Sequence, residues 1–284
     1  MNNPMPKAVF FDIDGTLVPY DTRRVSQEDR ETIEALRGQG TLVFIVTGRH
    51  ICDIDNIPFA VDGAVCCNGA LTYAVKGNCA HFYERERFVL VEDHPIPKRK
   101  AVEIAGIIAD NQIPASISTD TRTLFGNLTR KELEFIRRVN MPSPREGDVL
   151  ETAINESVYS FNAFVSPEEE KILFNACIGR SRRNVLWGLD TFRWCDEYCD
   201  INVHGLDKVV GIKKILDIYR IGPADIIAFG DGFNDIAMLE FAGRGIAMET
   251  AADAVKSAAD CVTASAADSG VSRYLKRLGL SVLL

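Results

Sequence analysis

Short, wholly apolar runs alternate with amphipathic stretches toward both ends of this chain. Such runs are typical of strands buried on both faces of a parallel sheet, and the amphipathic stretches are typical of helices that cover it. The predicted strands are residues 9–11, 41–46, 63–67, 200–203, 225–229, 245–248 and 261–262. The first predicted helix begins after Ser26, an N-cap residue followed by acids, and ends at Gly38 and Gly40. Further helices are predicted at 208–215, 236–241 and 250–258, and a last one after residue 262. The pattern therefore predicts an α/β fold with a Rossmann-like parallel-sheet core.

From about residue 84 the pattern changes, because apolar residues in the predicted strands begin to alternate with polar ones. Alternation is typical of strands with only one face on a hydrophobic core. The predicted helices here are 99–110, 129–138 and one that begins at 166–169, and the predicted strands are 115–119, 123–125, 158–165, 185–187 and 191–195. We therefore expect a core domain of residues 1–83 and 193–284, interrupted by an inserted α+β domain of residues 84–192.

Two carboxylates, Asp12 and Asp14, stand at the end of the first predicted strand, and Gly15 follows to turn the chain. In open α/β sheets, ligands bind at the carboxyl ends of the strands. Two acids placed there repel each other unless a cation lies between them. Oxygen ligands of this kind suit Mg²⁺, which keeps several of its waters and binds substrate phosphate. This stretch therefore indicates a magnesium site.

Three other interpretations of the same stretch compete. A calcium-binding loop requires glycine at its sixth position and glutamate at its twelfth, where this sequence has Leu17 and Arg23, so that interpretation fails. A polar turn without a ligand stays open. So does the phospho-accepting aspartate of a signalling receiver, which stores a phosphoryl group instead of hydrolysing a substrate.

Small or polar residues also end the next two predicted strands. Thr47, Gly48 and Arg49 follow the second strand, and residues 68–70 (Asn-Gly-Ala) follow the third. A right-handed crossover from the first strand to the second places Thr47 beside Asp12 at the same edge of the sheet. Taken alone, Thr47 reads as an ordinary strand cap and Arg49 as a partner in a surface salt bridge.

A further pair of acids follows the predicted strand at 225–229. Asp231 comes after a glycine turn, and Asp235 lies one helical turn further on. With the two carboxylates of the first strand, Asp231 completes a predicted site for a hard cation. Lys208, at the start of a predicted helix, adds a positive charge, although a lone lysine is usually a solvated surface residue.

Composition excludes several classes of partner. The chain of 284 residues has a formal charge of −8, and neither predicted domain has the basic excess that nucleic acids or anionic membranes require. No apolar stretch is long enough to cross a membrane. The eight cysteines form no Cys-x-x-Cys pair, which argues against zinc and for a reduced, cytoplasmic protein. A small molecule is the expected partner.

These stretches resemble the four motifs of the haloacid dehalogenase superfamily, in order and at matching spacings. The motif residues are 11–17 (Phe-Asp-Ile-Asp-Gly-Thr-Leu), 46–49 (Val-Thr-Gly-Arg), Lys208 and 230–235 (Gly-Asp-Gly-Phe-Asn-Asp). Residues 68–70, 245–248 and 268–271 narrow the resemblance to the Cof-like phosphatases. The inserted domain is similar to the cap domain of that subfamily. One departure is Glu-Thr-Ala at 249–251, where the family usually has Gly-Asn-Ala, and it leaves the shape and charge of the substrate entrance open.

The resemblance implies a Mg²⁺-dependent phosphatase that hydrolyses small phosphorylated metabolites, such as sugar phosphates, through an aspartyl-phosphate. Asp12 would be the nucleophile, and Asp14 would protonate the leaving oxygen and then activate water. The implied metal ligands are Asp12, Asp14 through its backbone carbonyl, Asp231 and Asp235. The implied phosphate- or substrate-binding residues are Thr47, Gly48, Arg49, Lys208 and Asn234, the last of which would also orient the metal ligands.

Two alternatives to a phosphatase stay open at this point. A sugar-phosphate mutase of the same superfamily commonly carries its cap between the first and second motifs, where this chain has room for only one helix. A receiver-like protein is a single small domain without an insertion. Neither the substrate nor the oligomeric state can be predicted from the sequence.

Overall fold

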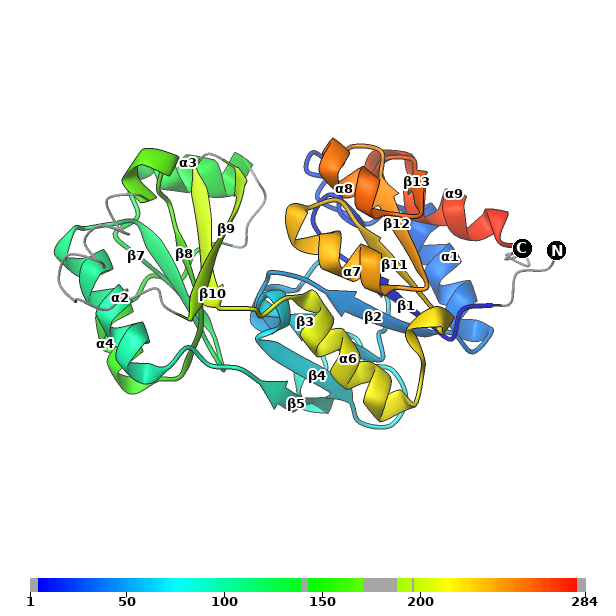
Figure 1. The fold of residues 1–284 in the computed structure, drawn as a ribbon, viewed down its shortest axis with the longest axis horizontal. Helices are drawn as coiled ribbons and strands as arrows, with labels where there is room; N and C mark the ends of the chain where they lie inside the picture. Colours follow the sequence, from blue (N-terminus) through cyan, green and yellow to red (C-terminus); the bar gives the residue numbers. More distant parts are fainter. Residues whose placement is uncertain (1–4, 139–142, 171–187, 196, 280–284) are drawn as a thin grey trace. The chain divides into compact units, whose positions relative to one another are not determined.

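The computed structural model of the chain describes residues 5–138, 143–170, 188–195 and 197–279, which fall into two compact units (Figure 1). The first unit belongs to residues 1–92 and 207–284 and the second to residues 93–206. The α/β fold class is confirmed. The predicted domain limits, 84 and 192, and the independence of the inserted domain stay predictions. No helix among the described residues is long and apolar enough to cross a membrane.

An eight-stranded sheet forms the centre of the first unit, in the order β13-β12-β11-β1-β2-β3-β4-β5. The strands that pair in parallel are β1 (Ala8–Phe11), β2 (Leu42–Val46), β3 (Gly63–Cys66), β11 (Ile226–Gly230), β12 (Arg244–Met248) and β13 (Cys261–Thr263). β4 (Leu71–Val75) runs antiparallel to β3, and β5 (Phe88–Asp93) follows it at the edge. β1 lies in the middle with all of its residues buried, as its apolar run predicts.

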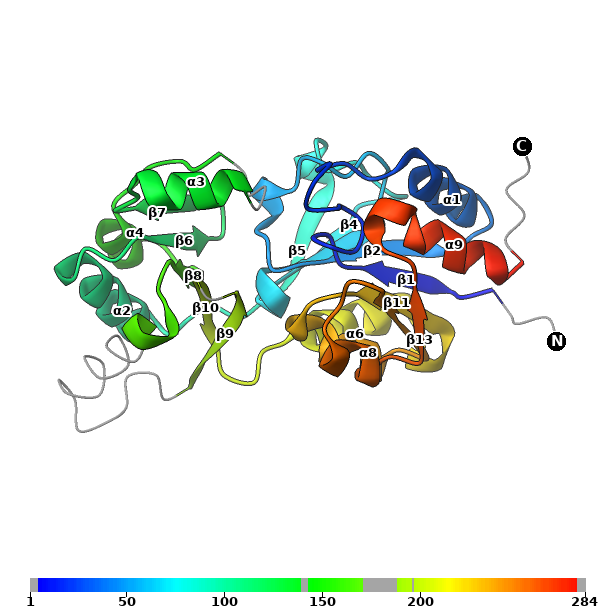
Figure 2. The same cartoon turned by 90° about the horizontal axis from the view of Figure 1, so that it is seen from above.

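Helices cover both faces of this sheet (Figure 2). One face packs against α6 (Lys208–Tyr219), α7 (Ile236–Phe241) and α8 (Asp253–Ala258), whose apolar residues share a core with β1 and β2. The other face carries α1 (Gln27–Gly38) and α9 (Gly270–Arg277), which contact each other. The predicted N-cap of α1 is confirmed, because Ser26 Oγ accepts a hydrogen bond from the Asp29 amide at 3.0 Å.

The second unit is an antiparallel sheet of five strands with helices against it. The strand order is β7 (Thr123–Gly126), β6 (Ala115–Thr119), β8 (Val158–Ala163), β10 (Tyr198–Val203) and β9 (Leu189–Cys195). The helices α2 (Lys98–Asp110) and α4 (Val149–Asn155) share its apolar core, and α3 (Arg130–Arg138) packs its apolar residues against Phe125, Phe164 and Tyr198. Ala115 and Ile117 of β6 and Val158 and Phe161 of β8 belong to that core. The alternation predicted one open face, but every residue of β6 is buried, and every residue of β8 except Asn162.

Three elements were not predicted, and one prediction cannot be compared. β4 and β5 extend the core sheet, and α4 lies in a stretch for which the sequence predicted no element. The helix predicted to begin at 166–169 does begin at residue 167. The strand predicted at 185–187 lies outside the described residues. The other predicted helices and strands are confirmed to within a few residues.

Candidate active site

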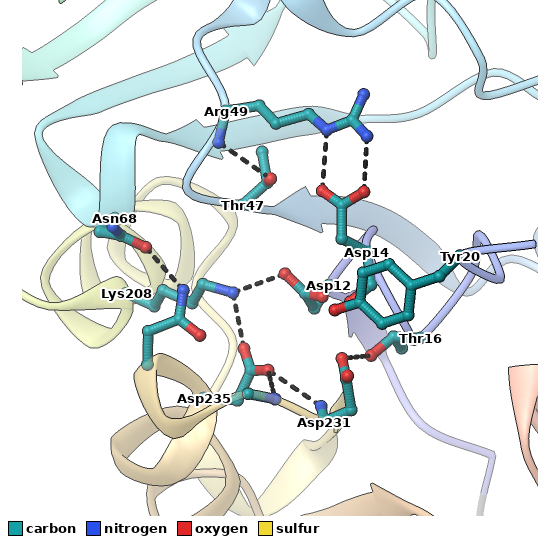
Figure 3. A network of polar contacts seen from close by, with 12 residues as sticks. Asp12, Asp14, Thr16, Tyr20, Thr47, Arg49, Asn68, Lys208, Asp231 and Asp235 are labelled. Carbon is teal, nitrogen blue, oxygen red and sulfur yellow. Dashed lines mark hydrogen bonds and ion pairs between the residues drawn. The ribbon is translucent and has the colours of Figure 1, made fainter. Parts of the chain in front are cut away.

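The parallel pairing of β1 with β11 brings the acidic residues together. Phe11 lies opposite Phe229, so the residues that follow both strands emerge at the same edge, and the Asp12 amide donates to the Phe229 carbonyl at 3.0 Å. Ligand atoms of Asp12, Asp231 and Asp235 all lie within 4.8 Å of one another. These three carboxylates could hold a metal ion together, and Figure 3 shows them facing one another.

The turn after β1 packs directly onto Asp231. Gly15 has φ +82, and a Cβ placed on it would lie 2.0 Å from Asp231 Oδ2. Only glycine combines this backbone conformation with such a close approach. Thr16 Oγ1 donates to Asp231 Oδ1 at 2.9 Å. The Asp-x-Asp-Gly-Thr stretch therefore fixes the position of a carboxylate that comes 215 residues later.

Lys208 lies fully buried between two carboxylates. Its Nζ donates to Asp12 Oδ1 and to Asp235 Oδ1, both at 2.6 Å. Burial alone would lower the pKa of Lys208, but the attraction of Asp12 and Asp235 raises it above its ordinary value. Asp207 caps the helix at this point, accepting from the Val209 amide at 2.8 Å. The side chain is thus a fixed cation next to the predicted nucleophile.

Asp235 has both oxygens engaged by protein donors. Oδ1 accepts from Lys208, and Oδ2 accepts from the amides of Asp231 at 3.0 Å and Gly232 at 2.8 Å. It therefore organises the loop that presents Asp231 and holds the lysine in place.

Burial dominates the electrostatics of the acids. It raises the pKa of Asp12 well above its ordinary value, although Lys208 pulls in the opposite direction. Burial, with the nearby charge of Asp235, also raises the pKa of Asp231 to about 7, against the Thr16 hydrogen bond. A cation that comes close to such buried carboxyl groups stabilises their ionised form.

Asp14 lies at the same edge but binds a different cation. Arg49 Nε donates to Asp14 Oδ2 at 2.8 Å and Nη2 to Oδ1 at 2.5 Å, a bidentate pair (Figure 3). Burial would lower the pKa of Arg49, but Asp14 raises it above the ordinary value. A third of the Asp14 side chain is exposed, so the carboxylate is held in place and still accessible.

The structure also brings the remaining predicted residues to this edge. Thr47 Oγ1 accepts from the Arg49 amide at 3.1 Å, and the Thr47 amide donates to the Val65 carbonyl at 2.8 Å. Gly48 lies against Asn68, and Asn234 Nδ2 donates to Asn68 Oδ1 at 2.9 Å.

Two residues at this edge had no predicted role. Tyr20 is half exposed, and its hydroxyl donates to the Asp14 carbonyl at 3.4 Å. Its ring lies beside Asp14 and Thr16 in Figure 3. Nothing in the sequence marks this tyrosine, which stands in a polar loop. Asn68 belongs to a stretch that the sequence analysis singled out, but its contact with Asn234 joins residues that are 166 positions apart.

Comparisons with known proteins agree with this geometry. The family model described as "haloacid dehalogenase-like hydrolase" matches residues 9–275. The 5-amino-6-(5-phospho-D-ribitylamino)uracil phosphatase YitU of Bacillus subtilis is 29% identical, over 95% of this chain and 97% of its own. The pyridoxal phosphate phosphatase YbhA of Escherichia coli is 27% identical, over 95% and 97%. Among solved structures, the sugar phosphatase BT4131 superposes with a TM-score of 0.80 at 28% identity, over 97% of this chain and 100% of its own.

Proposed function

The chain belongs to the haloacid dehalogenase-like hydrolases, and we propose that it is a Mg²⁺-dependent phosphatase of small phosphorylated metabolites. The single observation that carries the proposal is the position of Asp12. This carboxylate ends the central strand, contacts a buried lysine at 2.6 Å and lies among the other acids of a possible metal site. A nucleophile, a fixed cation and metal ligands are the groups that phosphoryl transfer requires.

The charges of the site fit a divalent cation. Asp12, Asp14, Asp231 and Asp235 carry four negative charges when ionised, against the two positive charges of Arg49 and Lys208, which leaves two unbalanced. The donors are all oxygens, which favours Mg²⁺. We propose the carboxylates of Asp12 and Asp231 and the carbonyl of Asp14 as ligands, with Asp235 in support because protein donors occupy both of its oxygens. Bound there, Mg²⁺ would offset the negative charge of the phosphoryl oxygens.

The chain's own residues divide the reaction into two transfers. An Asp12 oxygen attacks phosphorus, the bond from phosphorus to the leaving oxygen breaks, and Asp14 gives that oxygen a proton. In the second transfer Asp14 takes a proton from water, the water oxygen attacks phosphorus, and the bond to Asp12 breaks. Lys208 and Thr47 would bind the phosphoryl oxygens throughout. Arg49 donates one hydrogen bond to each Asp14 oxygen, so each oxygen keeps a second lone pair that can carry the transferred proton.

The experiment that tests this proposal isolates Asp14. Alkoxides are poor leaving groups that need a proton, whereas p-nitrophenolate leaves without one. We expect Asp14→Asn to slow the first transfer from sugar phosphates by ~10²–10⁴-fold and to slow it far less with p-nitrophenyl phosphate. The second transfer still lacks its base, so a burst of p-nitrophenol and a phosphorylated Asp12 should follow. Rapid quench and intact-protein mass measurement at saturating Mg²⁺ would detect them.

A matched control is Asp21→Asn, which makes the same change on an exposed residue of the same loop. It should hydrolyse both substrates at the wild-type rate. Equal slowing of both substrates by Asp14→Asn, with no adduct, would mean that Asp14 has only a structural role. A wild-type protein that accumulates the adduct and never turns over would instead be a phospho-accepting protein.

The names of the relatives do not identify a particular substrate for this chain. The names of YitU, YbhA and BT4131 give three different phosphorylated compounds or classes, which supports a small metabolite and no particular one. We further propose that residues 84–192 form a cap that selects among such metabolites. In the first unit, Glu249 and Thr250 are exposed directly after β12, at the edge of the sheet that carries the catalytic residues.

A further inference from the structure

The turn that follows β3 has an unusual backbone. Cys67 and Asn68 have φ of 49° and 53°, and Gly69 has φ of 103°. Two successive non-glycine residues in the left-handed region cost roughly 1 kcal/mol or more each, and such conformations persist only where the surroundings hold them. Asparagine tolerates this region better than most residues. The contacts that hold this turn lead to three separate parts of the active site.

The first contact is with the loop after β2. The Cys67 amide donates to the Arg49 carbonyl at 3.0 Å, and the Asn68 amide donates to the Thr47 carbonyl at 3.1 Å. A Cβ placed on Gly48 would lie 3.3 Å from Asn68 Oδ1, so the absence of a side chain there lets the carboxamide pack closely. The turn therefore sets where Thr47 and Arg49 lie.

The second contact is with the start of α6. A Cβ placed on Gly69 would lie 2.2 Å from the carbonyl oxygen of Asp207, the residue that caps this helix. The turn and the helix end thus touch backbone to backbone. Lys208 is the next residue, and its Nζ lies between Asp12 and Asp235. Any displacement of the turn would be transmitted to the lysine.

The third contact is made by a side chain. Asn68 is 4% exposed, and its Oδ1 accepts from Asn234 Nδ2 at 2.9 Å, a hydrogen bond that Figure 3 shows. Asn234 belongs to the loop after β11 that also presents Asp231 and Asp235. A hydrogen bond from a side-chain donor to a buried carboxamide oxygen restrains both partners, because a buried hydrogen bond is costly to break.

We propose that Asn68 is a positioning residue that fixes the phosphate-binding groups of the loops after β2 and β11 relative to each other. It touches none of the reacting atoms and acts through Thr47 and Asn234, while the neighbouring Gly69 makes the contact with the start of α6. This positioning role extends the proposed function. The kcat/KM measurement that tests it rests on that proposed function. Errors of about 1 Å in such positions reduce rates by ~10²-fold, which is the scale of effect expected here.

The test separates the carboxamide from the backbone. Asn68→Gly keeps the left-handed conformation without strain and removes only the side chain. We expect it to lower kcat/KM by about ten- to a hundredfold and to weaken the binding of inorganic phosphate, measured by titration calorimetry. Asn234→Ala should have a similar effect. Since both variants break the same hydrogen bond, the double variant should lose little more than either single one.

Asn127→Gly is the matched control. Asn127 also has a left-handed backbone, with φ of 59°, and its Nδ2 donates to the Ile113 carbonyl at 3.1 Å in the second unit. Because Asn127 is exposed, the variant should change the urea midpoint less than Asn68→Gly does, and it should leave phosphate affinity and kcat/KM at wild-type values. A merely structural role for Asn68 would leave phosphate affinity and kcat/KM at wild-type values in both variants.

Two further results would overturn the inference. One is an Asn68→Gly variant that binds phosphate as tightly as the wild type. The other is a double variant whose loss of kcat/KM equals the product of the two single losses. A wild-type protein that binds phosphate but hydrolyses no ester would refute the proposed function alone, because the phosphate affinities of the variants would still test the positioning role. A wild-type protein that binds no phosphate would refute both.

Discussion

Asp29 offers a quantitative test of the electrostatics of this fold, because it is a fully buried acid away from the catalytic groups. It lies in the first turn of α1, where Oδ1 accepts from the Ser272 amide at 2.6 Å and Oδ2 accepts from Ser26 Oγ at 2.9 Å. Burial raises the pKa of Asp29 from 3.8 to about 6, and these two hydrogen bonds offset only part of the rise. The folded protein therefore binds this proton more tightly than the unfolded chain.

The sign and size of the effect follow from that difference. Below pH 4 the group is protonated in both states, and its contribution to stability is fully present. As the pH rises from about 4 to about 6, the unfolded chain ionises first and that contribution is lost. The difference between 3.8 and about 6 corresponds to roughly 3 kcal/mol. Asn cannot ionise and keeps an oxygen for the Ser272 amide.

We therefore expect Asp29→Asn to gain stability relative to the wild type by about 3 kcal/mol between pH 4 and pH 7. Urea unfolding at one-unit pH intervals, in the same buffer series, would measure the difference in unfolding free energy. Asp253→Asn is the control, because Asp253 is an exposed acid in the first turn of α8. The reasoning would be refuted if the difference in unfolding free energy between the wild type and Asp29→Asn did not change with pH. Asp29 would then titrate alike in the folded and unfolded protein.

Three other predictions follow from the site and the two units. Chelation should abolish hydrolysis and added Mg²⁺ should restore it, and Asp231→Asn should raise the Mg²⁺ needed for half-maximal rate by ~10–100-fold, as a metal titration of activity would show. Lys208→Met leaves two buried carboxylates without their cation, so urea unfolding at pH 7 should show a loss of ~3–5 kcal/mol, and a loss below about 1 kcal/mol would contradict this. Replacing residues 93–206 by a short linker should leave a folded protein that hydrolyses p-nitrophenyl phosphate without preference among larger esters, and an unfolded product by circular dichroism would contradict the domain prediction.

The sequence predicts the parts of the site that follow strongly apolar strands. Asp12 and Asp231 were predicted because each ends a strand buried on both faces, and parallel pairing of neighbouring strands leaves their carboxyl ends at one edge. The same argument placed Thr47. Lys208 could be assigned only through the resemblance to a family, because a lone lysine at a helix start has no pattern that distinguishes it.

Other features of the fold and the site could not be predicted from the local pattern of apolar and polar residues. β4 and β5 lie at one end of the sheet, with β5 at the edge. β5 has an apolar run at residues 88–91 but leaves five of its six residues partly or fully exposed, so it does not fit a strand buried on both faces. α4 has only seven residues, too few for a helical period to stand out. Tyr20 reaches the site through the path of a loop, and Asn68 through a contact with a residue 166 positions away. Neither the path of a loop nor a distant contact can be derived from one stretch of sequence.

The pair of Asp14 and Arg49 bears on whether this chain hydrolyses its aspartyl-phosphate or stores it. A protein that stores the group needs no second carboxylate beside the acceptor, because activating water there would erase the signal. Here Asp14 is present at the same edge, fixed by two N–H donors and partly open to solvent. The groups that Arg49 offers to Asp14 are also those that would bind phosphoryl oxygens. A phosphate ester that draws Arg49 toward itself would let the Asp14 side chain turn toward the leaving oxygen. Within the proposed mechanism, the binding role of Arg49 and the catalytic role of Asp14 are therefore linked.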